Sequence, residues 1–286
     1  MLWVPGGAWF WNEHSHENPR ECAKAVARNG FVVMTVNYRH CSHDYQLLEC
    51  ALAGLLLVMT LGLLAAARAA ERMLWSALLI AAILSLLAFE LSLHFCDTHA
   101  THYPENAWDV AYAVRWAVRH AREWGGDPER LLLVGHSAGA HLTAMLLADE
   151  RFFQRAGVPP HLLRGFLGIS GVYSARETQH SIMLRGLALD AFGACDERTL
   201  ARMMPAERVC HHPAPQHLPP CLLLSANFDY GLHAHALHLR RALRKRGVHV
   251  RLEQVKDASH FTVVKYYDTK HLPLLRRILA FFRHVL

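Results

Sequence analysis

Residues 131–142 read Leu-Leu-Leu-Val-Gly-His-Ser-Ala-Gly-Ala-His-Leu. The apolar run at the start predicts a buried strand, and the residues after the serine predict a helix. Gly135 and Gly139 flank Ser137 at a spacing that permits a sharp turn, because a residue without Cβ lets strand and helix approach closely. Between a strand and a helix, the Gly-x-Ser-x-Gly pattern makes Ser137 a candidate nucleophile that projects alone from the turn.

A serine hydroxyl is a weak nucleophile near neutral pH, so it requires a base that a third group holds in place. Asp229 follows the apolar run 222–226, and His260 follows the run 250–255. Both residues therefore come after predicted strands, where parallel sheets place functional groups. The order Ser137, Asp229, His260 predicts a catalytic triad. The alternative for Asp229 is a loop residue that caps the following helix.

A glycine pair follows the first predicted strand, in the segment Pro5-Gly6-Gly7-Ala8-Trp9. Glycines after a strand leave backbone amides uncovered, and preset N–H donors stabilise the oxyanion of acyl transfer. Gly6 and Gly7, together with the N–H of Ala138, are therefore the predicted oxyanion hole. The alternative for the two glycines is a simple turn.

Short apolar runs alternate with helical stretches along the chain. This alternation predicts an α/β fold with a mostly parallel sheet that helices flank on both faces. The predicted strands are 2–4, 31–37, 130–135, 163–170, 220–226 and 248–255. The predicted helices are 19–29, 107–124, 138–149, 234–246 and 272–285.

The segment 47–96 differs in composition from the rest of the chain. Two apolar runs, 47–67 and 73–95, are joined by a short link that contains Arg68 and Arg72. Each run is long enough to cross a bilayer and lacks a polar face, which disfavours the alternative of buried soluble helices. We therefore expect a transmembrane helical hairpin inserted into one catalytic domain formed by 1–46 and 97–286. The orientation in the membrane stays open, because the positive charges of the link and of the domain point in opposite directions.

Two other classes of function are disfavoured: nucleic-acid binding by the distribution of charge, and metal binding by the spacing of the histidines. The net charge is +6, but Lys and Arg are spread along the chain rather than gathered in runs beside aromatic residues, so no nucleic-acid partner is expected. The 22 histidines include clusters at 14/16, 211/212 and 233/235/238. None of these clusters has the spacing of a zinc site, so we expect surface histidines and no metal.

The chain resembles the hormone-sensitive-lipase-like and carboxylesterase branch of the α/β hydrolases, and most closely the isoprenylcysteine methylesterases. The matching segments are 5–9, 36–39, 125–128, 135–141, 170–173, 185–187, 228–230 and 259–260. The resemblance implies hydrolysis of a carboxyl methyl ester on a lipidic, prenylated cysteine without a cofactor. It also implies that Ser137, Asp229 and His260 act as nucleophile, acid and base.

The sequence departs from that family at two places. The family's first strands, which precede the Gly-Gly segment, are missing here, and the apolar pair interrupts the hydrolase rather than preceding it. The expected protein is thus a membrane-bound serine esterase, integral to the endoplasmic reticulum or Golgi membrane. Two alternatives stay open: an arylformamidase-like amidase, and a non-catalytic membrane protein derived from a truncated hydrolase.

Overall fold

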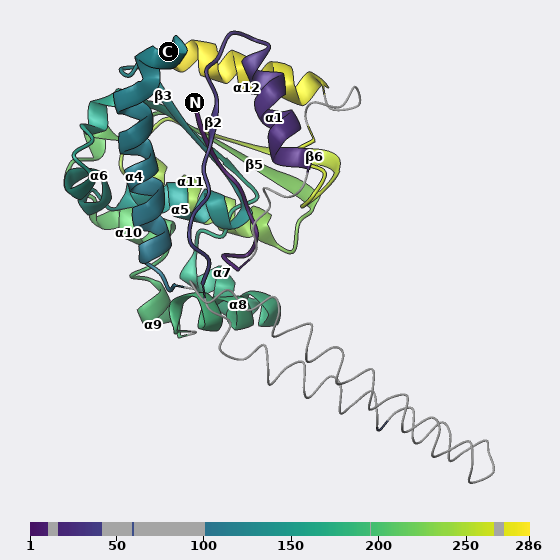
Figure 1. Ribbon diagram of the computed structural model, residues 1–286. Helices are drawn as coiled ribbons and strands as arrows, with labels where there is room; N and C mark the ends of the chain where they lie inside the picture. The colour runs from purple at the N-terminus through teal and green to yellow at the C-terminus, as the bar shows by residue number, and fades with distance from the viewer. Residues whose placement is uncertain (11–16, 42–58, 60–100, 195, 266–271) are drawn as a thin grey trace, which may run out of the picture. The chain divides into compact units, whose positions relative to one another are not determined.

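The computed structural model describes residues 1–10, 17–41, 59, 101–194, 196–265 and 272–286. Within these ranges all paired strands are parallel and form one sheet in the order β2-β1-β3-β4-β5-β6 (Figure 1). The strands are β1 (Leu2–Val4), β2 (Met34–Thr35), β3 (Leu131–His136), β4 (Leu163–Ile169), β5 (Cys221–Phe228) and β6 (Val250–Ser259). The α-helices are α1 (Glu17–Ala27), α4 (Glu105–His120), α5 (Ser137–Ala148), α6 (Arg151–Ala156), α7 (Ala175–His180), α8 (Ile182–Phe192), α9 (Glu197–Leu200), α10 (Pro205–Arg208), α11 (Leu232–Lys245) and α12 (Leu272–Val285). The 3-10 helices are η2 (Ala121–Trp124), η3 (Pro160–Leu162), η4 (Val209–His211) and η5 (Pro215–His217).

Helices cover both faces of the sheet, so successive strand residues alternate between two cores. Leu133 and Leu223 belong to the core shared with α4, α5 and α11. Leu132 and Leu222 belong to the core shared with α1 and α12, which lie together on the other face (Figure 1). Burial on both faces explains why the central strands read as continuous apolar runs rather than as alternating ones.

The predicted parallel α/β architecture is confirmed, with differences at the edges. The strand predicted over 31–37 is shorter, because β2 pairs with β1 through only Leu2–Met34 and Trp3–Thr35. The strand predicted to stop at 255 continues to Ser259, because β5 also continues and the pairing resumes after a bulge. The segment between α5 and β5, for which the sequence predicted only the strand 163–170, also contains α6 to α10.

The hairpin predicted for 47–96 lies outside the described residues, apart from Met59. Among the helices that the structure does describe, none is both long enough and apolar enough to cross a bilayer. The chain divides into two compact units, residues 1–41 with 101–286 and residues 42–100.

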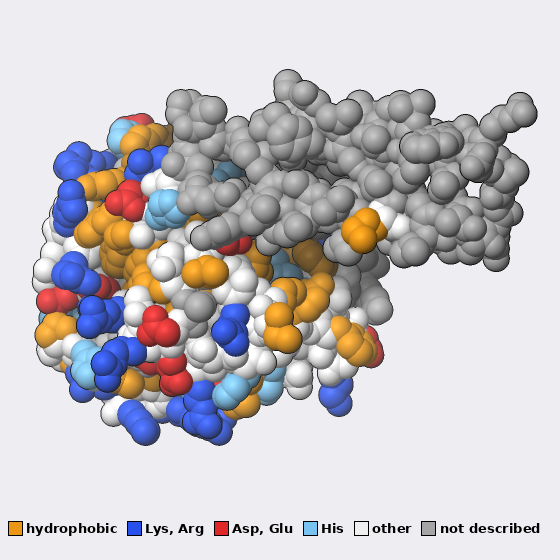
Figure 2. Space-filling view, turned by 90° about the horizontal axis from the view of Figure 1, so that it is seen from below, with side chains coloured by type: hydrophobic (Ala, Val, Ile, Leu, Met, Phe, Trp, Pro, Cys, Tyr) orange, Lys and Arg blue, Asp and Glu red, His pale blue; other side chains and the backbone are white. Residues whose placement is uncertain are grey.

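Charged and hydrophobic side chains are interspersed on the described part of the face in Figure 2. Lys and Arg side chains lie mainly toward its margin, with Asp, Glu and hydrophobic side chains between them. This distribution agrees with the scattered basic residues of the sequence.

Two glycines allow α5 to pack closely against the sheet. A Cβ on Gly135 would overlap Thr143 and the backbone of Gly139 and Ala140. A Cβ on Gly139 would overlap the carbonyl oxygens of Val4 and Pro5 at the end of β1. Because backbone cannot move aside as a flexible side chain can, these positions accept no side chain without displacing α5.

The substitution Gly139→Ala should therefore destabilise the fold by about 1–3 kcal/mol, the usual cost of overpacking. The matched control is Gly186→Ala in α8, where an added Cβ meets nothing within 4 Å. Alanine is the better helix former by up to about 1 kcal/mol, so this control should be neutral or stabilising. Midpoints of thermal unfolding measure both variants, and equal midpoints for the two would contradict the packing argument.

Candidate active site

The structure brings Ser137, Asp229 and His260 together at the carboxyl edge of the sheet. His260 Nε2 lies 3.0 Å from Ser137 Oγ, and His260 Nδ1 lies 2.7 Å from Asp229 Oδ1. Asp229 and His260 are buried, with 5% and 7% of their surfaces exposed. The three side chains thus form one continuous hydrogen-bonded chain, although 123 and 31 positions separate its linked partners.

The chemistry of the partners assigns the proton positions. An ionised carboxylate only accepts hydrogen bonds, so the Nδ1–H of His260 donates to Asp229. The other ring nitrogen, Nε2, is then unprotonated and accepts the hydroxyl proton of Ser137. In this arrangement a base faces the hydroxyl group, as proton removal from a nucleophile requires.

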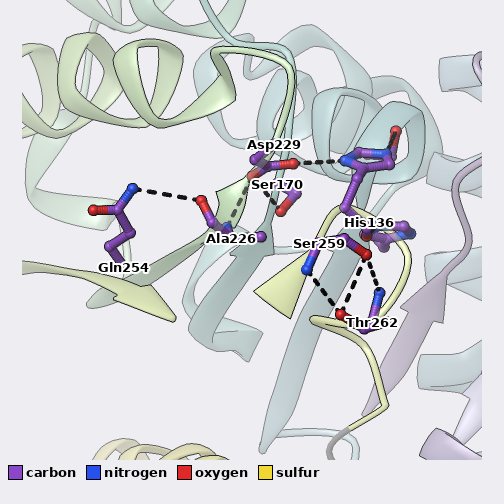
Figure 3. A network of polar contacts seen from close by, with 9 residues as sticks. His136, Ser170, Ala226, Asp229, Gln254, Ser259 and Thr262 are labelled. Carbon is purple, nitrogen blue, oxygen red and sulfur yellow. Dashed lines mark hydrogen bonds and ion pairs between the residues drawn. The ribbon is translucent and has the colours of Figure 1, made fainter. Parts of the chain in front are cut away.

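Further donors hold the carboxylate of Asp229. Ser170 Oγ donates to Asp229 Oδ2 at 2.6 Å, and the backbone N–H of Ala226 donates to the same oxygen at 2.9 Å (Figure 3). These bonds compensate the loss of hydration of a buried charge and leave Oδ1 for His260. Ser170 was not predicted as a site residue from the sequence. Its position directly after β4, between the strands that precede Ser137 and Asp229, is the signal that could have found it.

His136 supports the loop that carries His260. Its Nε2 lies 3.1 Å from the backbone carbonyl oxygen of His260, and the two rings lie 4.9 Å apart. Because His136 immediately precedes Ser137, it links the loop after β6 to the turn between β3 and α5. His136 lies within the elbow motif, but the motif alone predicts no role for its side chain.

Ser137 occupies a strained turn between β3 and α5. Its φ of 51° lies in the left-handed region, which costs about 1–3 kcal/mol for a residue with a side chain. Ser137 is the first residue of α5, so the N–H of the next residue, Ala138, belongs to the helical turn whose amides have no intrahelical partner. Such amides and the helix dipole favour negative charge beside the serine.

The predicted oxyanion segment begins beside this turn. β1 pairs with β3 in a register that sets Val4 opposite Gly135, so residues 5–9 emerge at the same edge as Ser137. Gly6 is buried and Gly7 is half-buried. The hydroxyl of Tyr38 donates to the carbonyl oxygens of Pro5 and Gly6, at 3.2 and 3.3 Å. The N–H of Phe10 also donates to the carbonyl oxygen of Gly7, so the second half of the segment is a turn.

The histidine cluster of α11 has separate structural partners. His233 bonds the hydroxyl of Ser225, and His238 pairs with Glu177. His235 accepts the backbone N–H groups of Tyr173 and Ser174, and burial lowers its pKa to about 3. The expectation of a surface residue is thus wrong for His235, which satisfies a buried loop. No three His, Cys, Asp or Glu side chains in the described ranges are placed to bind a metal ion.

Three exposed aromatic side chains adjoin the buried acid and base in the sequence. Phe228, Tyr230 and Phe261, here called the aromatic rim, are 69%, 55% and 56% exposed. The rings of Tyr230 and Phe261 lie 5.6 and 5.3 Å from the ring of His260. Large apolar groups exposed around a polar site are typical of a surface that binds an apolar ligand.

The fold and this site define a class. A helix-covered parallel sheet presents a serine after β3, an aspartate after β5 and a histidine after β6, joined by hydrogen bonds. The family model for the alpha/beta hydrolase fold matches residues 99–264, which is more than half of the chain. The chain belongs to this family.

Individual relatives match shorter stretches. A probable isoprenylcysteine alpha-carbonyl methylesterase of Arabidopsis thaliana is 29% identical over 136 residues, 43% of this chain and 28% of the relative. A probable carboxylic ester hydrolase of Mycobacterium tuberculosis is 32% identical over 94 residues, 29% of this chain and 22% of the relative. The matched stretch thus spans less than a third of either relative.

Solved esterases share the fold over nearly the whole chain. Esterase B from Lactobacillus rhamnosis has a TM-score of 0.65 at 15% identity, covering 99% of this chain and 75% of that one. The Pyrobaculum calidifontis esterase has a TM-score of 0.63 at 15% identity, covering 100% of this chain and 76% of that one. At such identities the likeness concerns the fold alone.

Proposed function

We propose that this chain is a serine hydrolase that cleaves a carboxylic ester. The single observation that carries the proposal is the hydrogen-bonded chain from Ser137 through His260 to Asp229. In this chain the base is oriented by a buried carboxylate and faces the hydroxyl, which is the geometry that nucleophilic acyl transfer requires.

The reaction follows from these contacts. Ser137 Oγ attacks the carbonyl carbon while its proton passes to Nε2 of His260, and Asp229 stabilises the imidazolium that forms. The N–H groups of Gly6, Gly7 and Ala138 donate hydrogen bonds to the carbonyl oxygen and stabilise the negative charge that develops on it. The imidazolium then gives its proton to the leaving alcohol, and an acyl-enzyme remains. Water, deprotonated by His260, attacks the acyl carbon, releases the carboxylic acid and restores the serine.

The proposed substrate is an ester with an apolar part, such as a methyl ester of a lipidated, prenylcysteine-like molecule. The exposed aromatic rim beside His260 supports this class, because it offers apolar surface next to the reacting hydroxyl. Relatives named as probable isoprenylcysteine alpha-carbonyl methylesterases point the same way.

The substitution Ser137→Ala should abolish turnover of a p-nitrophenyl ester, a loss of at least about 10³-fold, because no other hydroxyl takes the place of the nucleophile. It should equally abolish labelling by a fluorophosphonate probe, which reacts with an activated serine. Unchanged turnover in the variant would refute the assignment of Ser137. A folded wild-type protein that neither turns over the ester nor takes the label would favour a non-catalytic descendant of a hydrolase.

Ester and formamide hydrolysis are distinguished by paired substrates. A prenylcysteine methyl ester should be cleaved with a kcat/KM at least about 10-fold above that for an N-formyl aryl amine, since an ester is the easier acyl donor and its prenyl group meets the aromatic rim. Release of methanol and of the free aryl amine measures the two reactions. A preference for the formamide would identify an arylformamidase-like amidase instead.

We further propose that the segment 47–96 anchors the hydrolase in the endoplasmic reticulum or Golgi membrane as two spanning helices. Its two long apolar runs support this proposal, because each has the length and composition of a helix that crosses a bilayer.

The full chain should accordingly stay in the membrane pellet after carbonate extraction, whereas deletion of residues 47–95 should release it. Ser137→Ala serves as the matched control and should pellet as the wild type does, because the nucleophile lies outside the apolar segment. A deletion variant that still resists carbonate would refute the anchoring role.

A further inference from the structure

The oxyanion segment has an unusual backbone that needs support from its surroundings. Three consecutive residues have positive φ: Gly7 at 126°, Ala8 at 51° and Trp9 at 70°. Only the first is a glycine, so Ala8 and Trp9 hold a conformation that residues with side chains rarely adopt. The direction of the N–H groups in this segment depends on whatever keeps Trp9 in place.

Trp9 is held mainly by one side chain of the nucleophile helix. Its indole Nε1–H donates to Nδ1 of His141 at 3.2 Å, with the two rings edge-on at 5.3 Å. The ring of Phe192 packs against the indole at 5.0 Å, and the carbonyl oxygen of Trp9 accepts the N–H of Cys41. Trp9 is 2% exposed, so no water replaces these partners easily.

His141 is fixed in orientation because both of its ring nitrogens are engaged. Nε2 lies 2.8 Å from the carbonyl oxygen of Met203, an acceptor, and Nδ1 faces the indole N–H, a donor. The ring is therefore the neutral tautomer with its proton on Nε2. Burial lowers the pKa of His141 to about 4, so this tautomer persists near neutral pH. The other tautomer would place donor against donor at Trp9 and acceptor against acceptor at Met203, and turning the ring over would bring ring carbons to both positions.

His141 lies on the same helix as the nucleophile, α5. His141 lies four residues after Ser137, on the next turn of α5. One helix therefore carries the serine, the N–H of Ala138 and the acceptor that holds Trp9. The glycine contact between α5 and Pro5 secures the start of the oxyanion segment, and the His141–Trp9 bond secures its end.

We propose that His141 is a positioning residue that, through its hydrogen bond to Trp9, aims the backbone N–H groups of Gly6 and Gly7 at the developing oxyanion. The inference rests on the proposed hydrolase function and extends it to the support of the oxyanion hole. His141 has no contact with the reacting atoms in this role. It fixes the distance between two sets of donors, one on the loop after β1 and one on α5.

The test uses the full chain with Trp9→Phe and His141→Leu, which remove the donor and the acceptor of this bond. Each variant should lower kcat for a p-nitrophenyl ester by about 10- to 100-fold, because displaced oxyanion donors act only on the transition state. KM should change by less than about 3-fold. Affinity for an alkyl trifluoromethyl ketone, which the serine converts into a tetrahedral oxyanion, should fall by the same factor as kcat.

Two further variants separate positioning from packing. His141→Asn keeps an oxygen acceptor toward Trp9 and should recover part of the lost kcat. Phe192→Leu removes a ring that packs on both Trp9 and His141 but keeps an apolar side chain there and leaves the donor and the acceptor in place. It should therefore lower the thermal midpoint with kcat within about 3-fold of the wild type.

The outcomes are distinguishable from failure of the proposed function. An active wild type and an inactive Ser137→Ala, with Trp9→Phe and His141→Leu within 3-fold of the wild-type kcat, would overturn this inference alone. If Phe192→Leu lost as much kcat as Trp9→Phe and His141→Leu, the His141–Trp9 contact would act only through packing. That result would also overturn the inference. Should His141→Leu fail to fold, Trp9→Phe decides, because it keeps an aromatic ring. An inactive, unlabelled wild type would overturn the hydrolase proposal itself.

Discussion

The approach of α5 to β1 and β3 determines the geometry around Ser137. At Gly135 the space of a side chain is filled by the backbone of α5, and at Gly139 it is filled by the carbonyl oxygens that end β1. The helix can therefore start within one residue of the strand, which exposes Ser137 at the turn. The same contact sets the loop after β1 beside the amides of the first helical turn. The nucleophile and the proposed oxyanion donors thus share a single packing constraint.

His260 reaches Ser137 only because its loop returns over the sheet. Ser137 follows β3 and His260 follows β6, and three strand spacings of about 4.8 Å each separate these strands. A separation of about 14 Å cannot be bridged by one imidazole. Two hydrogen bonds to the backbone of His260 hold the loop in this position. The N–H of His260 donates to the carbonyl oxygen of Phe228, and its carbonyl oxygen accepts from the side-chain Nε2 of His136. β5 and the elbow therefore position the base together.

Short sequence patterns were sufficient to predict most strands and helices and the three residues of the triad. The elbow glycines, the apolar runs before Asp229 and His260, and the alternation of strands and helices all lie within short windows. The contacts of Ser170 with Asp229 and of His136 with the backbone of His260 join residues 59 and 124 positions apart. Such pairs depend on strand order, which no short window contains. The length of β2 was also not predictable locally, because its short partner β1 limits it.

Backbone strain is concentrated at the edge of the sheet that carries the site. Within the described residues, the non-glycine residues of positive φ are Ala8, Trp9, Ser137, Ser170, Tyr230 and Asp257. Ala8, Trp9, Ser170 and Tyr230 lie in the loops after β1, β4 and β5, Ser137 begins α5 directly after β3, and Asp257 lies near the end of β6. Each such residue costs about 1–3 kcal/mol, while a domain is stable by only about 5–15 kcal/mol in total. Random placement would not confine this cost to one edge, so the strain there is best explained by the orientation that each of these loops must give its polar groups.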